Sequence, residues 1–130
     1  MAVPDTGQGT ARKLYAAAIG AGGGEPFELD TAVAENLAAA CDKLVDDLRR
    51  AMDDGQHVTD VTGFPDLPTG HALTRGFADK GRQYLDTLTA FQETALLFKA
   101  AYLAAANRLA DAEAANQAAL RLITEYLEPR

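Results

Sequence analysis

The sequence predicts an all-α protein: an antiparallel helical hairpin with one very long second helix and a short N-terminal helix. Apolar residues recur at spacings of three and four over most of the 130 residues. Strand-forming residues never cluster, whereas alanine supplies eleven of the twenty residues in 100–119. Prolines and glycines gather between two such apolar patterns, at 62–70, and cannot continue a helix.

The first 26 residues are expected to form a tail with a short helix and a hinge, ahead of a hairpin domain over 27–130. Residues 1–9 carry one proline and two glycines, so we expect them to be weakly ordered. Thr10 is placed to cap a helix over 11–20. The glycine-rich run 20–24 then ends that helix and acts as a flexible hinge.

The first hairpin helix is expected to begin after Asp30, which is a suitable N-cap residue. Its apolar face follows a helical spacing and comprises Leu29, Val33, Leu37, Ala40, Leu44, Leu48 and Ala51. This helix either stops at Gly55 or continues to about Val61, because the same spacing persists beyond the glycine. We favour the longer form.

The second hairpin helix is expected to begin near Thr69 and to run to Glu128, where Pro129 ends it. The stretch from Gly70 to Leu127 alone would be roughly 85 Å long. Its residues follow a heptad pattern with two lanes, which is typical of a coiled-coil seam. The first lane holds Phe77, Tyr84, Phe91, Phe98, Ala105, Ala112, Ala119 and Tyr126, and the second holds Gly81, Leu88, Ala95, Tyr102, Leu109, Asn116 and Ile123. We expect Phe91 and Phe98 to be buried under the first helix.

The first helix is too short to cover the alanine-rich half of such a long partner. We expect residues 11–19 to dock along this half, which would still leave part of it uncovered. The remaining surface is predicted to bind another helix through Tyr102, Ala105, Leu109, Ala112, Asn116, Ala119 and Ile123. Asn116 either sets the register of this interface or lies at an exposed helix end. Dimerisation would complete a four-helix bundle, and Ala112→Arg would block it without unfolding the hairpin.

The composition argues against several kinds of chemistry. A net charge of -7 gives no electrostatic reason to bind nucleic acid. His57 and His71 lie near Asp60 and Asp66, but their spacing matches no metal-ligand pattern, so we expect solvated histidines and no metal or cofactor. Cys41, the only cysteine, is expected to be a small buried residue, with an intermolecular disulfide as the alternative. No nucleophile has a triad context, which predicts a protein that is not an enzyme.

The hairpin sequence Gly-Phe-Pro-Asp-Leu-Pro-Thr-Gly at 63–70 joins two helices of unequal length in an acidic chain. In these features the chain resembles the actinobacterial Trp-x-Gly (WXG-like) helical-hairpin family of type VII secretion, over roughly residues 27–123. Gly63-Phe64-Pro65 occupies the place of the family's Trp-x-Gly turn. The resemblance implies an adaptor or substrate that forms a homodimer, or a heterodimer with a secretion effector. The resemblance implies no catalytic role for this chain.

We also expect the chain to lack both a secretory signal and a membrane span, because its longest apolar segment, 95–106, is short and interrupted by Lys99. A cytoplasmic location follows, with export by a type VII system as the route that needs no cleaved signal peptide. The alternative function is a self-contained dimeric helical bundle that binds an apolar small ligand. Mass measured over a concentration series separates the two hypotheses.

Overall fold

The computed structural model describes residues 3–127 of the chain. Within them, helices make up 77% of the structure and there is no strand, which confirms the all-α prediction. The elements are α1 (Gln8–Ala18), α2 (Thr31–Asp54), the short 3-10 helix η1 (Gln56–Thr59), α3 (Pro68–Ala105) and α4 (Leu109–Leu127). No described helix combines the length and the apolar character that a membrane span requires.

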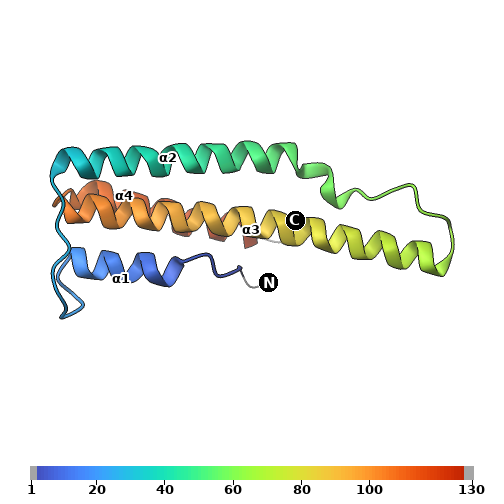
Figure 1. Cartoon of the computed structure of the whole chain (residues 1–130), viewed down its shortest axis with the longest axis horizontal. Helices are drawn as coiled ribbons and strands as arrows, with labels where there is room; N and C mark the ends of the chain where they lie inside the picture. The colour runs from blue at the N-terminus through green and yellow to red at the C-terminus, as the bar shows by residue number, and fades with distance from the viewer. Residues whose placement is uncertain (1–2, 128–130) are drawn as a thin grey trace.

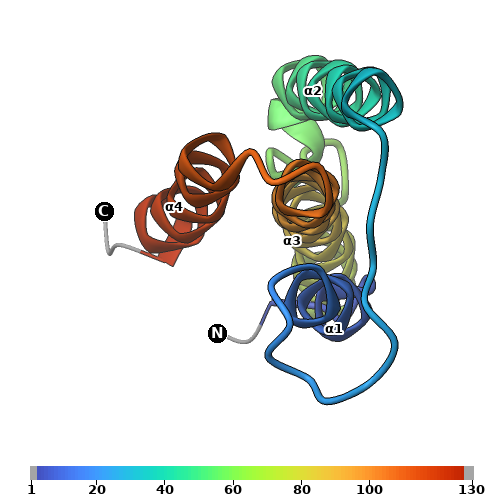
Figure 2. The same ribbon diagram turned by 90° about the vertical axis from the view of Figure 1, so that its left-hand side faces the viewer.

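Helix α3 is the central element, and the other three helices each pack on it and not on one another. Helices α2 and α4 run antiparallel to α3, whereas α1 runs parallel to it (Figure 1). Viewed end-on, α1 and α2 lie on opposite sides of α3 and α4 lies on a third side (Figure 2). On the fourth side, the connection between α1 and α2 is the one segment of residues 3–127 that crosses α3.

The boundaries of α2 and α3 differ from the sequence-based expectations. Helix α2 ends at Asp54 with Gly55 as its C-cap, so the longer form to Val61 is wrong and η1 follows instead. Asp30 occupies the N-cap position but makes no side-chain cap bond. Helix α3 begins at Pro68, one residue before Thr69, because the fixed φ of proline suits the first helical turn.

The expected second helix is broken into α3 and α4, and the prediction of one continuous helix is wrong. Asn107 adopts a left-handed conformation with φ of 61°. Its N–H donates to the carbonyl of Ala104 at 2.9 Å, and the N–H of Arg108 donates to that of Leu103 at 2.9 Å. This is a Schellman motif, which satisfies the last carbonyls of α3 and turns the chain back on itself. The expected helix end at Glu128 lies outside the described residues.

The core is built mostly from alanine. One cluster joins Ala38 of α2, Leu103 and Ala104 of α3, and Ala112 of α4, and partly buried Tyr15 and Ala18 of α1 pack against it. A second cluster joins Ala11, Leu97 and Ala119. Residues 11–19 therefore dock along the alanine-rich half as expected. The expectation that only these residues cover it is wrong, because α4 folds back over it.

The buried positions of α2 and α3 are not the expected ones. In α2 the buried residues are Ala34, Ala38 and Val45. Phe91 is 43% exposed, so its predicted burial is wrong, and Phe98 is only partly buried. Phe98 packs against the cluster of Ala11, Leu97 and Ala119, whereas Phe77, Tyr84 and Phe91 are exposed.

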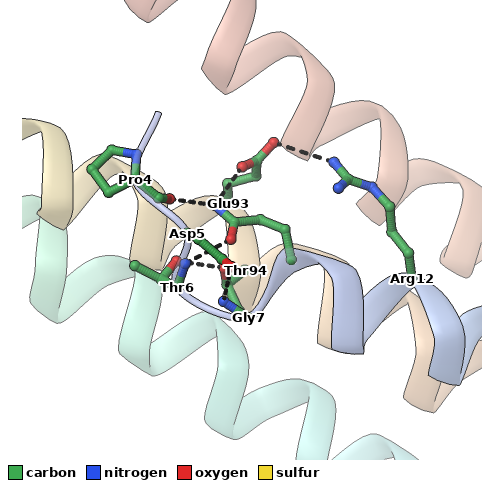
Figure 3. Close-up of polar contacts among 8 residues, drawn as sticks. Pro4, Asp5, Thr6, Gly7, Arg12, Glu93 and Thr94 are labelled. Atoms are coloured by element: carbon green, nitrogen blue, oxygen red, sulfur yellow. Dashed lines mark hydrogen bonds and ion pairs between the residues drawn. The ribbon is translucent and has the colours of Figure 1, made fainter. Parts of the chain in front are cut away.

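The N-terminal segment is held by polar contacts, contrary to the expectation of a weakly ordered tail (Figure 3). The hydroxyls of Thr6 and Thr94 lie 2.8 Å apart. The amide of Gln8 donates to the carboxylate of Glu93 at 3.1 Å, and Arg12 forms an ion pair with the same carboxylate at 3.7 Å. Because Glu93 is nearly buried, these partners offset its desolvation and fix α1 on α3.

Candidate protein-docking face

Each helix around α3 is held in register by a polar contact from α3. Gln92 of α3 donates its side-chain amide to the carbonyl of Val45 in α2 at 3.2 Å. Asp86 accepts a hydrogen bond from the Tyr126 hydroxyl of α4. The contacts of Glu93 and Thr94 described above hold α1. These polar groups hold α2, α4 and α1 against three sides of α3.

The aromatic lane, Phe77, Tyr84, Phe91 and Phe98, lies on the remaining side. Residues seven apart differ by only about 20° around a helix, so the lane follows one face of α3. Asp86, which holds α4, lies about 140° around the helix from Phe91. Tyr84 is 45% exposed and Phe91 is 43% exposed. The aromatic lane therefore points into the side of α3 that none of the described helices covers.

One row of α2 residues runs beside the aromatic lane. A Cβ added at Gly55 would come within 3.0 Å of the Tyr84 ring. At the other end of the row, the pKa of the Tyr102 phenol is raised. Burial is the larger cause, and the nearby Cys41 thiol adds to it. Leu48 lies midway between Cys41 and Gly55 at the same seven-residue spacing. The row of Cys41, Leu48 and Gly55 on α2 therefore runs alongside the aromatic lane of α3, in the opposite chain direction.

The apolar face of α2 expected from the sequence continues this surface. Leu44 is 46% exposed, and Leu37 and Leu48 are partly buried. We call the combined surface the docking face. It comprises Leu37, Cys41, Leu44 and Leu48 of α2 and Tyr84, Leu88, Phe91 and Phe98 of α3. None of these side chains carries a charge at neutral pH, although the chain as a whole carries -7.

Part of the docking face is closed by the connection between α1 and α2. The Phe27 ring meets Tyr102 edge-on, with 6.4 Å between ring centroids. The N–H of Leu29 donates to the carbonyl of Ala105 at 2.9 Å. Tyr102 in turn stacks on Phe98 at 6.0 Å. The connection therefore covers Tyr102, beyond the C-terminal end of the aromatic lane, and leaves Tyr84 and Phe91 exposed.

The side chain of Cys41 is partly buried at this face and forms no disulfide within the described residues. Burial raises its pKa above the ordinary value, the neighbouring Asp42 raises it further, and Lys99 opposes both effects. Lys99 also forms an ion pair with Asp42 at 2.8 Å. A thiol with a raised pKa is a weak nucleophile, so this environment gives Cys41 a packing role rather than a reactive one.

The seven residues predicted to bind a partner do not form one exposed surface. Ala105, Ala112 and Ala119 are buried between α3 and the helices that cover it. Tyr102, Asn116 and Ile123 are partly buried and Leu109 is exposed. A role for these residues in binding a partner stays a prediction. Ala112→Arg is no longer expected to leave the fold intact, because Ala112 is 0% exposed and packs on α3.

A groove of about 410 Å³ separates α2 from α4 above α3. Its rims are charged, but the charges already have partners. Arg108 bonds to Glu35 across the groove at 2.7 Å and to Asp111 at 2.9 Å. The ion pair of Lys99 and Asp42 lies on the same rim. These paired charges leave the groove without a free group to attract a ligand.

The two histidines lie apart in separate pairs. His57 contacts Asp60 at 3.3 Å, and His71 contacts Asp66 at 2.6 Å. All four side chains are exposed. In residues 3–127 no three His, Cys, Asp or Glu side chains converge as metal ligands would.

Sequence reasoning missed the buried polar residues of α3. A heptad pattern assigns Asp86, Gln92 and Glu93 to solvent, because none of them falls in either lane. The signal for their burial lay in the other helices, whose alanines allow close approach to α3 from three sides.

Comparisons with protein-family models, with curated proteins and with solved structures found no significant match to this chain.

Proposed function

We propose that this chain is a non-catalytic helical interaction protein, and that its docking face packs against the helical hairpin of another protein. The uncovered aromatic lane carries this proposal. Contiguous exposed apolar patches on a folded chain mark interaction sites, whereas apolar residues scattered singly do not. Here the exposed rings of Tyr84 and Phe91 lie in one lane beside Leu44 of the neighbouring helix.

The spacing of the lane favours a helix as the partner. Side chains at seven-residue intervals match the knobs-into-holes packing of another heptad-patterned helix. A hairpin seated on α2 and α3 would complete a four-helix bundle. In that assembly α1 and α4 would lie outside the bundle, on the other sides of α3.

The open part of the docking face is smaller than a standard interface. From Tyr84 to Phe98 it spans 14 residues, about 21 Å along α3. Two packed helices are about 20 Å wide, which gives a face of about 420 Å². A standard interface buries about 800 Å² on each partner, so the face suits a weak or transient complex. The absence of charged side chains on the face lets two acidic chains meet without opposing carboxylates, so a second copy of the chain is a suitable partner.

A role in type VII secretion follows from the resemblance of the hairpin turn to WXG-like proteins. In that role the partner is a helical effector, and the chain acts as its adaptor or is exported with it. Co-purification from the native host, followed by mass spectrometry, tests this part of the proposal. Recovery of no helical partner, together with a monomeric pure chain, would rule out both forms of pairing.

The docking face itself is tested with Phe91→Gln and a matched control, Leu120→Gln. Leu120 lies on α4, away from the face, and is 69% exposed. We expect Phe91→Gln to weaken association and the control to leave it unchanged. Mass is measured by light scattering over a concentration series, and helicity is measured by circular dichroism on the same samples. Equal association of both variants and the parent would refute the face.

A further inference from the structure

The loop end of the α2–α3 pair holds an apolar hollow of about 500 Å³ between η1 and α3. We call it the tip hollow. It lies at the end of α3 that extends beyond α1 and α4 (Figure 1). Its lining is almost entirely apolar, with one cation. The residues that matter here are Val58, Val61, Phe64, Phe77, Lys80 and Tyr84.

Aromatic rings form one wall of the tip hollow. Phe64 stacks on Phe77 with 5.7 Å between ring centroids and 10° between ring planes. Phe77 is nevertheless 56% exposed. A second apolar hollow of about 250 Å³ on the other side of Phe77 shares Lys80 and reaches Leu73. Together the two hollows form an elongated track that spans about 16 Å along α3, from Leu73 to Tyr84.

The close approach of η1 to α3 fixes the shape of the tip hollow. Gly81 is buried, and a Cβ added to it would collide with the backbone carbonyl of Val58. Only a residue without a side chain permits this contact. The wall that Val58 contributes is therefore held by backbone packing and does not depend on side-chain rotamers.

Lys80 carries the one charge of the lining. In the described part of the chain no carboxylate lies within ion-pair distance of it, and its ammonium makes only a long contact of 3.4 Å with Gln83. The neighbouring acids already have partners: Asp60 contacts His57, Asp66 contacts His71, and Asp79 contacts Arg82. An acidic protein thus holds an uncompensated ammonium beside an apolar track.

We propose that the tip hollow binds an amphipathic monocarboxylate of the fatty-acid class. The carboxylate would pair with the Lys80 ammonium, and the hydrocarbon chain would lie along Phe77. Small-ligand sites combine an apolar lining of this size with a few polar groups that fix orientation. A charged hydrogen bond at the mouth selects an anion over a cation with the same tail. The site adjoins the docking face at Tyr84, but the contact at Lys80 does not depend on the proposed docking of a helical hairpin.

The test uses dodecanoate below its micelle concentration, with dodecyltrimethylammonium as a ligand that has the same tail and the opposite charge. Isothermal titration calorimetry gives the affinity, and amide chemical shifts locate the site. Dodecanoate is expected to bind and to shift the amides of Val58 and Gly81. The cationic ligand is expected to bind at least about tenfold more weakly.

Variants assign the roles of the head and the tail. Lys80→Gln is expected to weaken dodecanoate binding about tenfold, whereas Lys13→Gln, at an exposed lysine of α1, is expected to change it less than about twofold. Phe77→Ala is expected to weaken binding of both ligands, with helicity unchanged by circular dichroism.

Three results would each overturn the proposal. The first is no binding of dodecanoate, and the second is equal loss in Lys80→Gln and Lys13→Gln. The third is that another copy of the chain fills the tip hollow. In that case Phe77→Ala would reduce the measured mass to the monomer value, and dodecanoate would have no effect on the mass of the parent. The first two results leave the Phe91→Gln test of the docking face unaffected, whereas the third would extend that face to Phe77.

Discussion

The turn at Asn107 determines whether the second half of the chain is one rod or two packed helices, and substitutions at this residue test it. In the left-handed conformation a side chain with a Cβ is strained, by about 1–2 kcal/mol for a residue such as alanine. Asparagine tolerates the conformation better, and glycine adopts it freely. Asn107→Ala is therefore expected to destabilise the fold by about 1 kcal/mol, whereas Asn107→Gly is expected to be neutral or slightly stabilising.

The opposite order is expected if the helix continued through residue 107. Alanine would then be the best residue at this position, and glycine would cost about 1 kcal/mol relative to it. Urea unfolding followed by circular dichroism gives the free energy of unfolding for the parent and both variants. A ranking with Asn107→Ala as the most stable form would refute the turn.

Small-angle scattering gives an independent measure of the same feature. Helix α3 has 38 residues and a length of about 57 Å, whereas a continuous helix over 68–127 would span about 90 Å. The parent is expected to show the compact form in monomeric samples. Asn107→Ala is expected to retain it, because straightening the chain would also expose the buried alanines Ala112 and Ala119.

Two further predictions concern α3 and the docking face. Gly81→Ala is expected to destabilise the fold and to displace η1, because its Cβ would meet the Val58 carbonyl. Gly76→Ala is the control, since a Cβ at residue 76 has open space. It is expected to stabilise α3 by up to about 1 kcal/mol in the same urea titration. Cys41 is expected to react with a thiol reagent more slowly at pH 8 in the folded chain than in urea, because its raised pKa leaves less thiolate, and Asp42→Asn should speed the reaction. Equal rates in the folded and unfolded chains would contradict the buried environment.

The sequence predicted the fold class and the loop before Pro68, because these depend on local periodicity and on proline. The heptad lanes are not the packing seam of one helix, since the turn at Asn107 interrupts them and Phe91 is exposed. The sequence could not predict the turn at Asn107. A single asparagine between two alanine-rich runs is compatible with a continuous helix, and only the packing of α4 on α3 decides against one. Likewise, a lane such as that of Phe91 shows which residues share a face, but not whether the chain itself covers that face. The side of α3 that receives α2 was therefore assigned wrongly.

The composition of the core explains why an uncovered aromatic lane matters for association. Alanine fills the contacts of α3 with its neighbours, and the larger rings of Tyr84 and Phe91 stay about half exposed. An aromatic side chain has roughly 200 Å² of accessible surface, so covering the exposed part of Phe91 removes about 90 Å² from water. At about 25 cal/mol per Å² this contributes about 2 kcal/mol.

In a symmetric dimer Phe91→Gln removes this contribution twice, about 4 kcal/mol, which corresponds to roughly a thousandfold weaker association. A heterodimer loses it once and is weakened only about thirtyfold. The measured ratio therefore distinguishes a second copy from a different partner.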